Sequence, residues 1–445
     1  MSENRGIFSL EEFYNLQVSG EITNIFDPFR YIKNVGTDFG YTSGGNVGSK
    51  VDRIDYSNDT ATASTKGPLS KSGHGLAATG NIDYGYVGWG WWQPGPASYD
   101  TNVDRVDYSN DTATATPKGP LSGPVKYKRS ATGNQSFGYF AMGYETPGTG
   151  GDGNRSTVRR LDYSNDNVAT TPKGPLNAAT VYGAASSNND FGYFGGGYPG
   201  GGRSQVDRID YSNDTATASP KGPLATARMT MAGTGNSSFG YFCGGEPGYI
   251  SRVERIDYGN DTATASPKGP LSRSTSQFAA AGNANYGYFI AGYPQKSTID
   301  RIDYSSDTGT ASTKGPLYRT AYRTDATGNP NYGYVHSGMS PSTWTNGSTE
   351  IARIDYSNDT ATTAIKGTFV QSKALSGAAF AAADNGRNPV STSYTPRIRW
   401  VDSASEGTPV TQGPAHGYFA GGAYPSVSSE KSTVDRIDYA NDTAT

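Results

Sequence analysis

Three repeated aspartates and an asparagine are the residues whose types and spacing come closest to a metal site. In one unit they are Asp52, Asp55, Asn58 and Asp59, and near-copies of this set recur along the chain. Carboxylate and amide oxygens are the ligands that calcium prefers, but known calcium loops have a denser acidic spacing and a glycine. We therefore predict that Asn58 and Asp59 form a turn between two strands. Asp55 is predicted to pair with the repeated Arg53, and neither a metal nor another cofactor is expected.

Few residues are candidates for catalysis. The chain has one cysteine, Cys243, and three histidines that lie far apart in sequence, His74, His336 and His416. A Cys-His nucleophile would need the two side chains to meet, whereas Cys243 lies in an aromatic phrase typical of a buried strand. Glycosidases need two carboxylates in unlike environments, and the carboxylates here repeat almost identically. We therefore expect no enzymatic activity and assign no catalytic residue.

A second group of residues with chemical potential is aromatic. Tryptophans and tyrosines occur in Gly- and Pro-containing segments whose length and sequence differ along the chain. Such side chains can stack on sugar rings or be buried against a protein partner. An equally simple alternative is that they fold down onto the domain itself. The residues that we predict to bind a ligand are Trp91, Trp92, Tyr99, Tyr144, Tyr198, Tyr249, Tyr293, Trp344 and Tyr424.

Charge and composition exclude other function classes. The 445 residues include 37 basic and 40 acidic ones, which gives a net charge of −3. This balance lacks the positive charge that nucleic-acid binding requires. No segment approaches the run of about 20 apolar residues that a membrane-spanning helix needs. The first residues contain acids and no apolar core, so they do not resemble a secretory signal.

The elements that must position these residues are tandem repeats. The phrase Val51–Thr60 occurs nine times in all, with the copy around Asp402 degenerate. A second phrase, an aromatic residue or histidine followed by Gly-Tyr, precedes eight of the nine copies, and Lys-Gly-Pro-Leu follows most of them. The second aspartates of the nine copies are Asp55, Asp107, Asp162, Asp210, Asp257, Asp303, Asp355, Asp402 and Asp438.

Each unit indicates four short strands. The Thr/Ala-rich, alternating and aromatic Gly-Tyr runs favour strands, and Asn58-Asp59 and Gly80-Asn81 are tight-turn signals. Four antiparallel strands in a repeat of about 48 residues are typical of a β-propeller blade. We predict an all-β chain in which residues 29–445 form a β-propeller of about eight four-stranded blades, or nine if the degenerate unit completes one. Residues 30–33 are predicted to be the first strand of the first blade.

The repeats resemble the kelch family. The matching phrases are a small-residue first strand (Met231–Thr234), an aromatic second strand ending in two glycines (Phe239–Gly245) and an acidic third strand (Val253–Asp257). The fourth-strand tryptophan of kelch repeats is absent. In a four-stranded meander, the first-to-second and third-to-fourth turns share one face, and these turns are nearly constant here. The second-to-third loops, which carry most of the aromatic candidates, share the other face and vary, as a recognition surface does.

Residues 1–28 precede the repeats. Ser9 and Glu12 have the spacing of a capping box, followed by apolar residues at helical spacing. The string Arg5–Tyr14 also resembles a segment of virion structural and tail-fibre proteins of marine bacteriophages, and the repeat phrase resembles kelch-like arrays of cyanophages. We predict that residues 1–28 form a short helical or extended attachment segment. Its predicted partner-binding residues are Leu10, Phe13, Tyr14 and Leu16.

These resemblances imply a non-enzymatic structural or adhesion protein of a bacteriophage particle, placed in a tail fibre, a baseplate or on the capsid. Several copies would be attached to other virion proteins through residues 1–28 and would contact a host-surface glycan or protein. Two alternatives stay open. One is a carbohydrate-active propeller enzyme, for which the irregular unit offers Asp384, Asp402 and Glu406. The other is a cellular kelch-type scaffold that binds one protein ligand.

Overall fold

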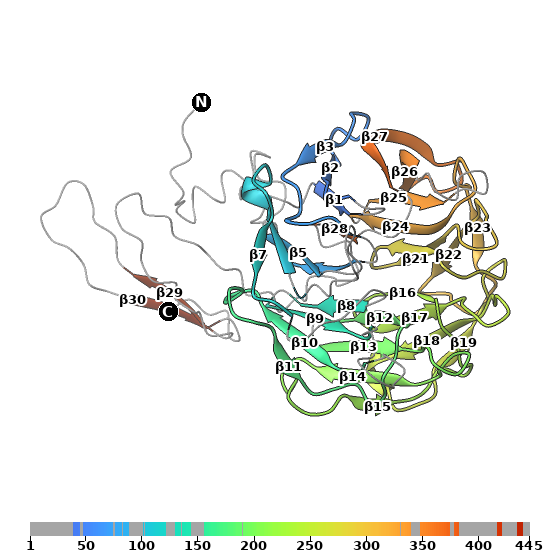
Figure 1. Cartoon of the computed structure of the whole chain (residues 1–445). Coiled ribbons are helices and arrows are strands. Elements are labelled where there is room, and N and C mark those ends of the chain that lie inside the picture. Colours follow the sequence, from blue (N-terminus) through green and yellow to red (C-terminus); the bar gives the residue numbers. More distant parts are fainter. Residues whose placement is uncertain are drawn as a thin grey trace, which may run out of the picture. The chain divides into compact units, whose positions relative to one another are not determined.

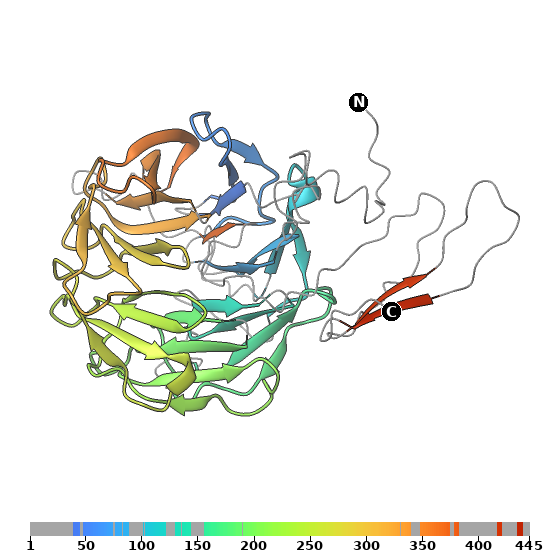
Figure 2. The ribbon, with the colours of Figure 1, turned by 180° about the vertical axis from the view of Figure 1, so that it is seen from behind.

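The seven blades of a β-propeller make up the first of two compact units. The structure, a computed structural model, describes residues 39–44, 48–73, 76–81, 83–88, 101, 103–121, 130–134, 136–143, 155–188, 190–329, 331–339, 348–373, 378–381, 416–420 and 434–438. The units are Met1–Pro389 and Val390–Thr445. Among the described residues, the first contains seven four-stranded sheets and the second one two-stranded sheet. The predicted all-β propeller is therefore confirmed, but it has seven blades and not eight or nine (Figures 1 and 2).

Six of the blades are formed by four consecutive antiparallel strands. The first strand of each blade contacts the first strands of both neighbouring blades, so these strands form the inner ring. In chain order the six blades are β4 (Ala77–Gly80), β5 (Tyr84–Gly88), β6 (Val103–Asp107) and β7 (Thr116–Lys118); β8 (Ser130–Gly133), β9 (Phe137–Ala141), β10 (Val158–Asp162) and β11 (Thr171–Lys173); β12 (Ala184–Ser187), β13 (Phe191–Gly195), β14 (Val206–Asp210) and β15 (Ser219–Lys221); β16 (Ala232–Gly235), β17 (Phe239–Cys243), β18 (Val253–Asp257) and β19 (Ser266–Lys268); β20 (Ala279–Gly282), β21 (Tyr286–Ile290), β22 (Ile299–Asp303) and β23 (Ser312–Lys314); β24 (Tyr322–Gly328), β25 (Tyr332–Met339), β26 (Ser348–Asp355) and β27 (Ala364–Lys373). The short 3-10 helices η2 (Tyr108–Asn110) and η3 (Tyr258–Asn260) lie in third-to-fourth turns.

The remaining blade, the first in the chain, closes the ring. It contains β1 (Phe39–Ser43), β2 (Val51–Asp55) and β3 (Ser64–Lys66), and its innermost strand is β28 (Ala378–Ala381), which follows the seventh blade in sequence (Figure 1). The prediction that residues 30–33 would fill this place is therefore wrong. Because β28 follows the seventh blade in sequence and pairs with β1 of the first blade, it connects the two blades. It also covers the inner edge of β1, which would otherwise be an unpaired strand edge.

The last two copies of the repeat fall in the second unit. The degenerate copy around Asp402 lies outside the described residues. The ninth copy forms β29 (His416–Ala420) and β30 (Val434–Asp438), which pair with each other in the second unit. Their register matches that of a blade, because Tyr418 opposes Arg436 as Tyr334 opposes Arg353 in the seventh blade. The repeat phrase therefore predicts this hairpin correctly.

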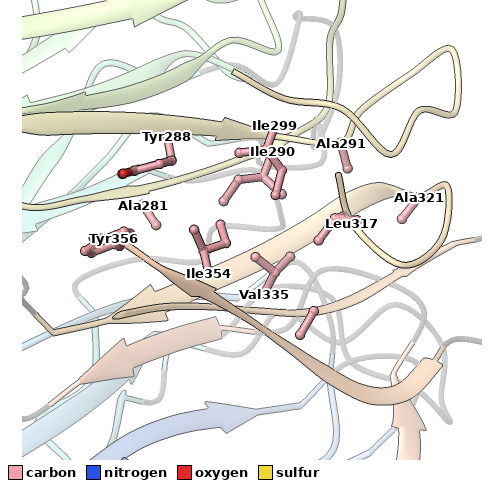
Figure 3. Close-up of a cluster of buried hydrophobic side chains, with 11 residues drawn as sticks. Ala281, Tyr288, Ile290, Ala291, Ile299, Leu317, Ala321, Val335, Ile354 and Tyr356 are labelled. Carbon is pink, nitrogen blue, oxygen red and sulfur yellow. The ribbon is translucent and has the colours of Figure 1, made fainter. Parts of the chain in front are cut away.

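The tyrosines of the Gly-Tyr phrases form the core between blades. Tyr193 is fully buried, and its ring stacks on that of Tyr258 in the next blade with centroids 4.7 Å apart. Such a tyrosine pair is present at all seven interfaces, with centroids 4.7 to 5.0 Å apart. Around each pair lie aliphatic side chains from both blades, as Figure 3 shows for the sixth and seventh blades, where Ile290 and Ile299 lie near Ile354. The Gly-Tyr tyrosines therefore join neighbouring blades and do not lie on the surface.

One buried aspartate holds the same three donors at every interface. Asp214, in the third-to-fourth turn of the fourth blade, accepts hydrogen bonds from Tyr139 Oη at 2.7 Å and Arg160 Nη1 at 3.0 Å of the preceding blade. Lys173 Nζ of that blade lies 3.0 Å from its second oxygen. We call these residues nodal aspartates; they are Asp59, Asp111, Asp166, Asp214, Asp261, Asp307 and Asp359.

The nodal aspartates show that the predicted pairing of Arg53 with Asp55 is wrong. Arg53 donates to Asp111 of the next blade at 2.9 Å, and not to Asp55. Asp55 instead accepts hydrogen bonds from the backbone nitrogen and the hydroxyl of Ser57, which shapes the start of the turn. The predicted turn at Asn58 and Asp59 is confirmed, but its aspartate joins two blades as well as forming the turn. Asp59 itself closes the ring by accepting from donors of the seventh blade.

The glycine of each Lys-Gly-Pro-Leu phrase is required by a close backbone approach. Gly222 N donates to Asp261 O at 2.8 Å, and a Cβ on Gly222 would lie 1.6 Å from Ala263 O. We expect Gly222→Ala to lower the free energy of unfolding in urea by about 3 kcal/mol, because backbone atoms must move apart. The matched control is Gly309→Ala, where an added Cβ meets nothing within 4 Å. Equal losses in the two variants would contradict this explanation.

Candidate functional site

The loops that precede the first strands and follow the second strands are bonded to each other within each of three blades. In the fourth blade Val181 and Tyr198 exchange two backbone hydrogen bonds of 3.2 and 2.8 Å. Met229 with Glu246, and Ser276 with Tyr293, form the same bridges in the fifth and sixth blades. We call this side of the propeller the loop face and the opposite side the turn face. The bridges give the loop face a fixed backbone that presents its side chains.

A line of backbone hydrogen bonds also joins the fourth, fifth, sixth and seventh blades across the loop face. Thr230 N donates to Tyr182 O at 2.8 Å, Gln277 N to Thr230 O at 3.2 Å, and Arg323 N to Gln277 O at 2.8 Å. All four residues have left-handed backbone, with φ of 62°, 54°, 52° and 54° for Tyr182, Thr230, Gln277 and Arg323. We call them the collar residues. Left-handed residues other than glycine are uncommon and cluster at functional sites, and here one strained position carries four unlike side chains.

Three tyrosines from three blades form a continuous aromatic row beside the collar. The rings of Tyr249 and Tyr293 lie 5.3 Å apart at 58°, and those of Tyr293 and Tyr322 lie 5.5 Å apart at 64°. Tyr322 is buried and packs with Met339, whereas Tyr249 and Tyr293 are half-buried. The Arg323 guanidinium lies 5.6 Å from the Tyr322 ring centroid. The row therefore has a buried end that fixes it and an accessible end at Tyr249.

A polar network runs beside this row. Ser276 Oγ donates to Glu246 Oε1 at 2.7 Å, and Gln277 Nε2 donates to the same oxygen at 3.1 Å. Arg323 Nε donates to Gln277 Oε1 at 2.9 Å. The Gln277 amide thus bridges an acid from the fifth blade and a guanidinium from the seventh. This network fixes the orientation of three planar polar groups at the protein surface.

The environment of the accessible tyrosine disfavours its ionised form. Desolvation raises the pKa of Tyr249, and the neighbouring Tyr293 and Glu246 raise it further. We call Glu246, Tyr249, Gln277, Tyr293, Tyr322 and Arg323 together the loop-face patch.

Other reactive groups in the described part of the chain serve the interior. Cys243 is fully buried, as predicted, and burial raises the pKa of its thiol. Burial also raises the pKa of the Asp207 and Asp300 carboxyls. Asp207 accepts from the backbone nitrogen of Asn177, and Asp300 from the hydroxyl of Ser272, both in the preceding blade. Among the residues that the structure describes, no group of three or more His, Cys, Asp or Glu could hold a metal ion, and no helix is long and apolar enough to cross a membrane.

The structure describes three of the predicted ligand-binding residues. Tyr249 and Tyr293 contact each other in the loop-face patch, and Tyr198 lies on the same face in the fourth blade with 43% of its surface exposed. The other predicted residues lie outside the described parts of the chain, so their roles stay predictions. They are Trp91, Trp92, Tyr99, Tyr144, Trp344 and Tyr424 on the loops, and Leu10, Phe13, Tyr14 and Leu16 near the N-terminus.

Sequence reasoning missed the polar half of the patch. Glu246, Gln277 and Arg323 come from three different units, and none belongs to a repeated phrase. Left-handed backbone at a residue other than glycine has no clear sequence signature. A residue-by-residue comparison of the units would still have shown that the position nine residues before the aromatic phrase is not constant, and that it holds Tyr182, Thr230, Gln277 and Arg323 in four successive units.

No protein-family model matches the chain, and no curated protein sequence matches it. Among solved structures the chain is similar to that of YjhT, with 12% sequence identity and a TM-score of 0.50. The similarity covers 66% of this chain and 97% of that one. At this identity it supports the fold alone, a β-propeller with repeated blades.

Proposed function

We propose that this chain is a non-enzymatic recognition module that binds its partner through the loop face of the propeller. One contrast carries the proposal. On the turn face, a nodal aspartate holds the same three donors at each of the interfaces. On the loop face, the collar keeps the same backbone in four units but carries Tyr182, Thr230, Gln277 and Arg323. A constant scaffold with a side-chain set that varies on one face is the arrangement of a binding surface.

The buried carboxylates support a non-enzymatic role. Asp207 and Asp300 have the raised pKa that a general acid needs, but both are turned to the preceding blade and bonded there. Their equivalent in the second blade, Asp104, accepts from Ser70 in the same way. The raised pKa values of the Asp207 and Asp300 carboxyls follow from their burial between blades, so we assign these carboxylates to the scaffold.

The biological setting that we propose is a bacteriophage particle, with the chain as a kelch-like tail-fibre, baseplate or capsid-associated protein. This part of the proposal rests on the sequence resemblance of Arg5–Tyr14 and of the repeat phrase to virion proteins. In this setting residues 1–28 attach the chain to other virion proteins, several copies are present, and the propeller meets the host surface.

Two measurements test the proposal. Gradient-purified phage particles from the source culture should contain tryptic peptides of the chain, and deletion of residues 1–28 should remove them. The purified chain should adhere to host cells, and adhesion should fall at least about tenfold when Gln277 and Arg323 are both replaced by alanine. The matched control replaces two exposed turn-face residues, Asn213 and Asn260, by serine and should adhere normally. Equal effects of the two double variants, or no adhesion of the wild-type chain, would contradict the proposal.

A further inference from the structure

We propose that the loop-face patch binds a sugar ring of a surface glycan, with Tyr249 and Tyr293 stacking on the ring and Glu246, Gln277 and Arg323 holding its hydroxyl groups. This inference rests on the proposed recognition function and names the class of ligand. It is carried by two features of the patch, an oriented aromatic pair and a fixed set of planar polar groups.

The aromatic pair is prepared for stacking. The rings of Tyr249 and Tyr293 are tilted by 58°, so neither covers the face of the other. The ring of Tyr293 packs at 64° against that of the buried Tyr322, and its backbone is fixed by two hydrogen bonds to Ser276. The C–H face of a sugar ring packs against an aromatic face, and little conformational entropy is lost when the tyrosine is already fixed.

The polar groups beside the rings suit hydroxyl groups on neighbouring carbons. Within the described part of the chain, Glu246 Oε2 and Arg323 Nη2 have no hydrogen-bond partner, while Glu246 Oε1 and Arg323 Nε are used to fix the network. The patch therefore offers a charged acceptor and a charged donor on the two sides of the Gln277 amide. A hydroxyl group both donates and accepts, so adjacent sugar hydroxyls can bond to both groups with charge-assisted hydrogen bonds.

The composition of the patch favours a glycan over a protein or a polyanion. Its one acid and one base cancel, so there is no excess positive charge to attract phosphates. A protein partner would need exposed apolar anchors at the centre of its contact. The large exposed hydrophobic residues in the described part of the chain are Val168, Tyr198 and Ile365, and none of them belongs to the patch. A sugar ring has apolar C–H faces and a rim of hydroxyl groups. The aromatic rings of the patch suit the C–H faces, and its polar groups suit the hydroxyls.

The test uses the full chain and printed arrays of bacterial surface polysaccharides, with methyl glycosides of glucose, galactose, mannose and fucose as solution probes for saturation-transfer NMR. We expect Tyr249→Ala and Gln277→Ala each to weaken binding to the recognised polysaccharide by about tenfold or more. Tyr249→Phe keeps the ring and should stay within about threefold of the wild type. The matched control is Val168→Ala, an exposed apolar side chain of the third-to-fourth turn between β10 and β11 on the turn face, which should bind normally. An unchanged thermal midpoint shows that each variant is folded.

The possible results separate this inference from the proposed function. Loss of polysaccharide binding in Tyr249→Ala but not in Val168→Ala supports the glycan site. Adhesion to host cells that survives periodate oxidation of their sugars but is abolished by protease would overturn the glycan ligand and leave the recognition function standing. Polysaccharide binding that Tyr249→Ala and Gln277→Ala do not alter would overturn the site. No adhesion to cells and no polysaccharide binding would overturn both proposals.

Discussion

Replacing the nodal aspartate Asp214 by alanine is expected to lower the free energy of unfolding by about 3 kcal/mol, measured by urea denaturation at neutral pH. The carboxylate is 5% exposed and lies between Arg160 at 3.0 Å and Lys173 at 3.0 Å, whose side chains are 22% and 9% exposed. Without it, two largely desolvated cations face each other across a blade interface. The Tyr139 hydroxyl, whose pKa is raised by burial and by Asp214, loses its acceptor as well.

The matched control for this variant is Asp210→Ala, four residues earlier in the same turn. Asp210 accepts from the backbone nitrogen and hydroxyl of Ser212, and it makes no contact across the interface among the described residues. Loss of such a local capping bond costs about 1 kcal/mol. If Asp210→Ala were as destabilising as Asp214→Ala, the stability would come from the shape of the turn and not from the node between blades.

A chain that ends at residue 373 is expected to lose the folded monomer, whereas a chain that ends at residue 389 is expected to keep it. The first truncation removes β28, which pairs with β1 from Ser43 to Gly40 and contacts the first strands of the second and seventh blades. Without β28, the inner edge of β1 is open and the ring has a gap. Open strand edges pair with other chains, so we expect aggregation and a thermal midpoint lower by about 10 °C or more.

The chain ending at residue 389 separates closure from the contribution of the second unit. It keeps the seven blades and β28 but lacks the last two copies of the repeat. Size-exclusion chromatography should show a monomer with a single thermal transition. If it behaved like the chain ending at residue 373, the last two copies would be needed for the ring, as a count of eight or nine blades requires.

The blade itself was predictable because its signals are local. The Gly-Tyr phrase forms the second strand and buries its tyrosine, and the Asn-Asp phrase forms the third-to-fourth turn, as at Asn58 and Asp59. Alternation and turn chemistry act over a few residues, and the repetition of the phrases makes each signal stronger. The number of blades is different, because it depends on how many wedges complete a circle.

What was not predictable depends on contacts between distant segments. The closing strand β28 follows the seventh blade, and nothing in its Ala-rich sequence marks it as the partner of β1. The choice between Asp55 and Asp59 as the partner of arginine depends on which carboxylate is turned to the neighbouring blade. In the candidate site, Tyr249 and Tyr293 could be predicted as binding residues because they are aromatic. Gln277 could not, because its position in the polar network depends on Glu246 and Arg323 from two other blades.

In the proposed function, the loop face binds the partner, and the contacts on the turn face hold neighbouring blades together. Hydrogen–deuterium exchange of the full chain, with and without a host cell-surface extract, tests it most directly. We predict slower exchange in the extract for peptides that contain Glu246–Ile250, Ser276–Gln277 and Tyr293–Lys296, and unchanged exchange for turn-face peptides such as Ser212–Thr215. Slower exchange confined to the turn-face peptides would contradict the account.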